Sequence, residues 1–171
     1  MTQRAPGRLS WRPMSRLRFT SLAQAASAVA ALGKRPQASV DVSEGTWSPA
    51  RVLHHCAASI ECSVQGFPRH KPWPVRAIAR RFVLRKWLGQ GFMTHRRNDP
   101  VPGLDEGDPD PALAPAADRL LAAIAAFEAA PALAPHAVFG VQPRDLYARY
   151  HAIHLADHLS AFTVDGAPFS P

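Results

Sequence analysis

Prolines and glycines divide this 171-residue sequence into five segments that have the character of helices. The segments span about residues 20–33, 48–65, 74–88, 115–129 and 143–162. The second is the best marked: Ser48 can cap its first free amides, Pro49 occupies its first helical position, and Gly66 and Pro68 end it. No stretch shows a convincing strand pattern, and the alanine-rich composition favours helix.

Helices joined by loops, without strands, predict an all-α fold: an antiparallel four-helix bundle with an additional short helix and a long proline-rich loop. A chain of this length suits one domain, which we place at residues 18–165, with residues 1–17 as a flexible tail. The arginine-rich start loosely resembles a targeting peptide, but polar residues interrupt the apolar run that follows, so that run is interpreted as the first helix. The loop, residues 89–114, is long enough to have a function or to wrap the surface.

The net charge of +7 raises the question of an acidic partner. The arginines gather in two groups without an RNA-binding motif or zinc-finger spacing, so nucleic acid is disfavoured. No apolar run approaches the roughly 20 residues that span a bilayer, and the basic segment 74–88 is interpreted as a half-buried bundle helix rather than a membrane-surface helix. Cys56 and Cys62 point apart on one helix and cannot bridge, which predicts reduced thiols and a cytoplasmic protein.

Three of the eight histidines lie in the segment HAIHLADHL, residues 151–159. On a helix, His151, His154 and His158 share the sector that should face the core, whereas Asp157 points away and is expected at the surface. A buried imidazole without a partner costs about 1–3 kcal/mol, so an inward stripe of histidines needs a common explanation. A metal ion provides one, because His154 and His158 have the i, i+4 spacing that lets two rings reach one ion.

A third ligand should come from another helix, and the second segment offers His54 and His55. Both lie beside the apolar face of that helix, on opposite sides, and the helical wheel alone does not choose between them. Glu61 neighbours His54, which is an ordinary surface arrangement and leans weakly toward His55. From the pattern alone, a metal site and a set of ordinary histidines are equally well supported.

Several runs resemble the DinB/YfiT-like metal-binding superfamily, and more narrowly a bacterial branch of unknown function within it. The runs are WSPARVLHHCAASIECSVQGFP, GFMTH followed by PVPG, APHAVFG and HAIHLADHL, and the resemblance covers roughly residues 19–162. It implies a compact bundle of four main helices that is often a dimer. Many members hold a divalent metal with three histidines, one of them eight residues after a tryptophan. Here Trp47 leads to His55, and the HxxxH pair supplies His154 and His158.

The resemblance therefore implies a divalent ion (zinc, nickel or iron) on His55, His154 and His158, and hydrolysis or thiol-linked transfer on a small molecule. Three histidine ligands leave coordination positions open for water or substrate. The alternative is a non-catalytic bundle that acts through binding or dimerisation as a homodimer.

Other residues have weaker claims to a role. His151 is the best candidate for a further pocket residue, and a core histidine bonded to the backbone is an equally good interpretation. His136 and His95 are interpreted as loop residues rather than as parts of a pocket, and Cys62 as core filling rather than part of the site. Three aromatic residues are interpreted as core or loop anchors: Trp73, Trp87 and Phe92.

Overall fold

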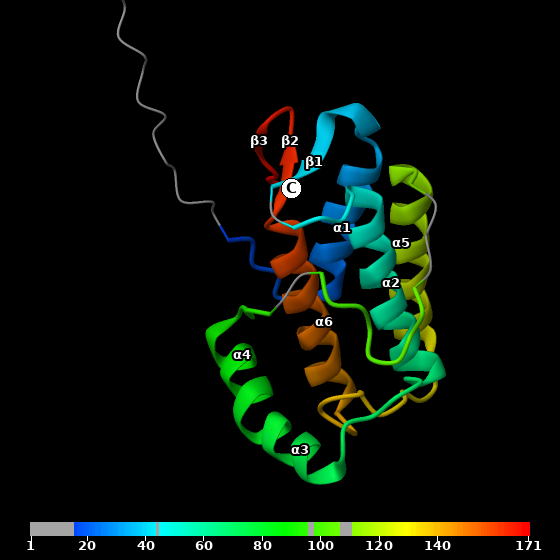
Figure 1. The fold of residues 1–171 in the computed structure, drawn as a ribbon, viewed down its shortest axis with the longest axis vertical. Helices are drawn as coiled ribbons and strands as arrows, with labels where there is room; N and C mark the ends of the chain where they lie inside the picture. The colour runs from blue at the N-terminus through cyan, green and yellow to red at the C-terminus, as the bar shows by residue number, and fades with distance from the viewer. Residues whose placement is uncertain (1–15, 44, 96–97, 107–110) are drawn as a thin grey trace, which may run out of the picture.

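The computed structural model describes residues 16–43, 45–95, 98–106 and 111–171 of the chain. Long helices stand side by side in its body, a small sheet lies near the C-terminus, and a helical arm extends along one side (Figure 1). The predicted flexible tail, residues 1–17, falls almost entirely outside the described ranges. Leu17 itself is described, and its backbone N–H donates to the Ser160 Oγ at 2.9 Å.

The body is built from helices α1 (Leu22–Gly33), α2 (Pro49–Gln65), α5 (Leu113–Ala129) and α6 (Arg144–Leu159). Their bounds lie close to those that the sequence predicts. The Ser48 Oγ accepts from the Arg51 N–H at 3.3 Å, so the start of α2 is capped as expected. Helix α5 packs along α2 and α1, and α6 packs against α1, α2 and the arm. The chain is mostly helical, as predicted.

Small side chains bring these helices close together. Ala25 and Ala28 of α1, Ala57 of α2 and Ala116 of α5 are fully buried. A Cβ on Gly33 would lie 2.7 Å from the Cβ of Ala117, so α1 and α5 have no room for a side chain at this position. This close packing holds α1, α2 and α5 together, and α6 packs against α1 and α2.

A three-stranded antiparallel sheet contradicts the expectation that the fold has no strands. Strands β1 (Val40–Val42), β2 (Phe162–Val164) and β3 (Ala167–Pro168) lie in that order. Strands of two or three residues are too short to show a period of two in the sequence. Helix α6 ends at Leu159 rather than at the predicted residue 162, because Phe162 is already part of β2, where its side chain is buried.

The arm, residues 73–90, comprises α3 (Trp73–Ile78), a π-helical stretch (Ala79–Leu84) and α4 (Arg85–Gln90). It was expected to be half-buried, and this is wrong: in this fully described segment only Leu84 is buried. Trp73 is 74% exposed, so it anchors nothing in the core. The arm touches the body mainly where α4 meets α6, and no helix or strand of the described residues packs strongly on its outward side.

The other two aromatic residues of this region do act as anchors. Trp87 is half-buried with its ring centroid 6.0 Å from that of Phe139. The Phe92 ring lies 4.4 Å from the guanidinium carbon of Arg16. Within the ranges that the structure describes, no helix is both long and apolar enough to cross a bilayer.

The proline-rich connection that follows α4 runs back across the side of the body where α2 and α6 face each other (Figure 1). Met93 and Val101 bury their side chains and hold it there. This path matters for function because it brings two polar side chains, His95 and Glu106, to the histidines on the helices.

Candidate metal centre

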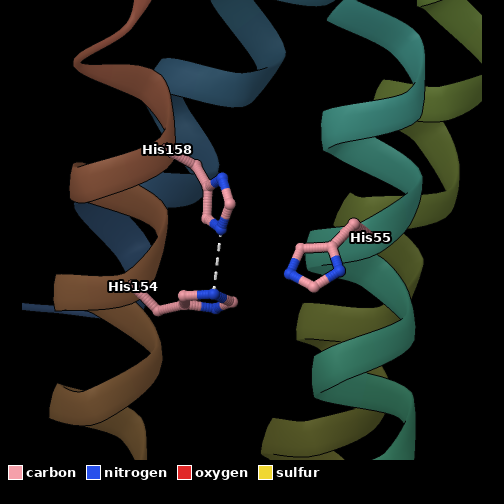
Figure 2. Close-up of side chains that lie close together, drawn as sticks. All are labelled: His55, His154 and His158. Atoms are coloured by element: carbon pink, nitrogen blue, oxygen red, sulfur yellow. Dashed lines mark hydrogen bonds between the residues drawn. The ribbon is translucent and has the colours of Figure 1, made fainter. Parts of the chain in front are cut away.

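Helices α2 and α6 bring His55, His154 and His158 together, although about a hundred residues separate the first from the other two in sequence. One ring nitrogen from each lies within 4.8 Å of the others. Figure 2 shows the His55 ring reaching from α2 toward the two rings on α6. His154 and His158 are one turn apart, with their Nε2 atoms separated by 3.0 Å. All three side chains are buried.

A carboxylate from the connection sets the orientation of His55. The Glu106 Oε1 lies 2.9 Å from His55 Nδ1 and also accepts from the Val101 N–H at 2.8 Å. Burial raises the pKa of Glu106, but the hydrogen bonds from His55 and Val101 outweigh burial and leave the pKa below its usual value. An ionised Glu106 accepts the proton of His55 Nδ1, which leaves the lone pair on Nε2 toward the other two rings.

His95 is a fourth imidazole at this cluster. Its Nε2 lies 3.2 Å from His158 Nε2, and its Nδ1 lies 3.2 Å from the Asp157 Oδ2. The expectations of a solvated loop histidine and of a surface aspartate are therefore both wrong. Asp157 is 3% exposed, and every residue of α6 from His151 to Leu159 is buried, so this part of the helix has no solvated side.

The electrostatics at His154 favour its neutral form. Burial, followed by the neighbouring imidazoles of His158, His95 and His55, lowers the pKa of His154 well below its usual value. Tyr150 stacks on the His154 ring with the planes 10° apart, which keeps the ring in place. Neutral imidazole is the form that binds metal ions, so the donor set fits a divalent ion such as Zn²⁺, Ni²⁺ or Fe²⁺. Nitrogen donors alone do not choose among these metals.

A cavity of about 240 Å³ adjoins the cluster. His55, His95 and His154 form one part of its wall, and aromatic side chains that include Phe67 and Tyr150 form another. A small molecule in this space would lie directly against the histidines.

His136 also lines this cavity, although sequence reasoning favoured a loop role. It has both roles, because its Nδ1 accepts the backbone N–H groups of Val138 at 3.0 Å and Phe139 at 3.2 Å and so closes the turn before α6. Burial lowers the pKa of His136 to about 3, which keeps this part of the wall uncharged.

His151 lies apart from the cluster. Its Nε2 is 2.8 Å from the Ser63 Oγ, which itself donates to the Ser59 carbonyl, so the hydroxyl oxygen accepts from His151. The His151 ring stacks on Tyr147 with the planes 11° apart. His151 is not among the residues that line the cavity, and its partner is a side-chain hydroxyl rather than a backbone carbonyl.

The remaining polar residues of α2 behave as structural groups. Arg119 of α5 binds Glu61 through two nitrogens, at 2.9 and 2.7 Å, and lies 3.2 Å from His54 Nδ1. His54 is thus part of a surface ion-pair group, as its neighbour Glu61 suggested. Cys56 and Cys62 are free and buried, and burial raises the pKa of the Cys62 thiol above its usual value.

A family of proteins of unknown function, DUF1569, matches the chain over residues 11–165. The chain belongs to the DUF1569 family. No curated protein and no solved structure matches it. Membership of DUF1569 carries no activity with it, and it provides no link to the DinB/YfiT-like superfamily. The function of this DUF1569 protein therefore has to be argued from its histidine cluster.

Proposed function

We propose that this DUF1569 protein binds a divalent metal ion through His55, His154 and His158. The observation that carries the proposal is the convergence of three buried ring nitrogens within 4.8 Å. His154 Nε2 and His158 Nε2 lie 3.0 Å apart, and one ion could bind these two nitrogens and a nitrogen of His55 together. The Glu106 carboxylate adds support, because metal-binding histidines commonly donate their other ring N–H to such a group.

The neighbouring cavity suggests what the site acts on. When bound, an ion on three imidazoles acts as a Lewis acid with positions open to water or a small molecule. The cavity has room for a small molecule, and Phe67 and Tyr150 would contact an apolar part of it. We propose hydrolysis or thiol-linked transfer on such a molecule, in keeping with the resemblance to the DinB/YfiT-like superfamily.

We further propose that residues 18–165 form a single DinB-type bundle in the cytoplasm. The packing of α1, α2, α5 and α6 around one core supports the bundle, and the family match over residues 11–165 supports the extent of the domain. The free cysteines support a reducing compartment.

Elemental analysis of the purified protein tests the metal site. We expect a stoichiometric divalent ion in the native chain and a loss of most of it in His55→Ala. His54→Ala is the matched control, because its ring is adjacent on the same helix but pairs with Arg119 instead. A native chain that takes up no ion after zinc loading, or an unchanged content in His55→Ala, would contradict the proposal.

One observation favours binding or dimerisation as a second function. Val75, Ile78 and Phe82 follow one another at spacings of three and four on the arm and are 46%, 61% and 64% exposed. Such an apolar strip on one side of a helix typically marks a contact surface. We propose that a second copy of the chain covers it, as the often dimeric superfamily implies.

Sedimentation of the native chain and of Phe82→Ser tests the dimer. We expect a dimer for the native protein and a monomer for the variant. The control is Arg80→Ser, which replaces a basic residue on the same arm. A native monomer at micromolar concentration would rule this surface out as a dimer interface.

A further inference from the structure

The nitrogen His158 Nε2 has two close imidazole neighbours. It lies 3.0 Å from His154 Nε2 and 3.2 Å from His95 Nε2. A ring nitrogen carries either one proton or one lone pair, so a single good hydrogen bond satisfies it. Hydrogen bonding therefore accounts well for one of the two contacts but not for both.

A cation shared by His95, His154 and His158 would account for both contacts. Nitrogen ligands bind Zn²⁺ at about 2.1 Å, which places neighbouring corners of a tetrahedron about 3.4 Å apart. The observed separations of 3.0 and 3.2 Å are close to that spacing. The ring of His95 is also as near to those of His154 and His158, at 5.1 and 5.0 Å, as the ring of His55 is, at 5.6 and 5.1 Å.

His95 has a carboxylate beside its Nδ1, as His55 does. Its Nδ1 lies 3.2 Å from the buried carboxylate of Asp157, a contact at ion-pair distance without hydrogen-bond geometry, whereas His55 Nδ1 is hydrogen-bonded to Glu106 at 2.9 Å. A carboxylate at this nitrogen favours the tautomer with the proton on Nδ1 and the lone pair on Nε2. The rings of His55 and His95 thus reach the cluster from different segments, each with its Nε2 lone pair available and a carboxylate behind it.

We propose that His95 is a fourth imidazole ligand of the metal centre and the one that an incoming small molecule replaces. The inference rests on the proposed function. His95 comes from the connection rather than from a helix, its side chain is 24% exposed, and it lines the cavity together with His55 and His154. Replacement of this ligand would open the ion to the cavity and leave the three ligands on α2 and α6 in place.

Proton NMR of the full chain loaded with Co²⁺ counts the ligands. Each imidazole that binds through Nε2 keeps a proton on Nδ1, which gives one strongly shifted, solvent-exchangeable signal. We expect four such signals in the native protein and three in His95→Ala. The control is His70→Ala, because His70 is an exposed histidine that is not part of the cluster; this variant should keep four.

Two further measurements support the count. We expect His95→Ala to bind Co²⁺ at least about tenfold more weakly, which is the lower end of the losses seen when a group that supports a metal site is removed. Added imidazole should restore the native visible spectrum of cobalt-loaded His95→Ala, because it can occupy the vacated position. His95→Gln is the second variant, and circular dichroism verifies that each variant is folded.

The outcomes separate this inference from the proposed function. Three shifted signals in the native protein that persist in His95→Ala would overturn the fourth ligand and leave the site of His55, His154 and His158 intact. A folded native protein that binds no Co²⁺ would overturn the proposed function and this inference with it.

Discussion

Acid should destabilise the metal-free protein through His151 in particular. This imidazole is fully buried, stacks on Tyr147 and donates to the Ser63 Oγ. Burial lowers its pKa from 6.5 to about 3, because a charged ring in this position would lose its hydration. In the unfolded chain the ring is in water and takes up a proton near its ordinary pKa.

The sign and the size of this change in the free energy of unfolding follow from the number of protons that each state binds. Between pH 6.5 and about 3 the unfolded state holds the proton and the folded state does not, so the free energy of unfolding falls as the pH falls. Well inside this window one such group costs about 1.4 kcal/mol per pH unit. From pH 7 to pH 5, His151 alone should remove about 2 kcal/mol of stability.

Urea denaturation at pH 7 and pH 5, with a chelator present, measures this loss in the native protein and in His151→Phe. The variant replaces one ring with another and leaves the Ser63 hydroxyl bonded to the Ser59 carbonyl. Its loss between the two pH values should be about 2 kcal/mol smaller than the native loss. His70→Ala is the control, since it removes an exposed histidine instead of a buried one, and it should show the native loss. Equal losses in the native protein and His151→Phe would refute the reasoning.

Two further predictions concern the site and the packing. Glu106→Gln removes the charge that supports His55, so the affinity for zinc, measured by competition with a chelator, should fall about 10- to 100-fold. The control Glu61→Gln should leave the affinity unchanged. Equal affinities in the two variants would contradict the role of Glu106. Gly33→Ala places a methyl group 2.7 Å from the Cβ of Ala117, and this overpacking should cost about 1–3 kcal/mol, partly offset by better helix propensity. Thermal unfolding should then show a lower Tm, and an unchanged or higher Tm would mean that α1 shifts freely.

The helices of the body and the pairing of His154 with His158 could be predicted because their signals are local. Ser48 and Pro49 mark the start of α2 within two residues, and the spacing of His154 and His158 places both on one side of α6. The choice of His55 over His54 needed the family resemblance, since the wheel alone left it open. In the structure His54 Nδ1 lies 3.2 Å from Arg119, and a nitrogen of His55 lies within 4.8 Å of those of His154 and His158; the choice of His55 as a ligand stays a prediction.

What the sequence did not reveal depends on contacts between distant segments. His95 and Glu106 reach the cluster only because the connection crosses between α2 and α6, and no local pattern encodes that path. Asp157 was misplaced because the wheel assumes one solvated side, whereas α6 is covered all round at this level. The arm was misjudged for the opposite reason, since Ile78 and Phe82 have the hydrophobicity of core residues but stay 61% and 64% exposed among the residues that the structure describes.

The connection after α4 supplies one contact near each end of its described part, His95 at one end and Glu106 at the other. An ion at the centre would therefore tie the described part of this connection to the body at two points. Binding of the ion and docking of the connection on the body would then be coupled, and each would stabilise the other by the same free energy. A substitution that weakens the docking of the connection, even far from the imidazoles, would then lower the affinity for the ion.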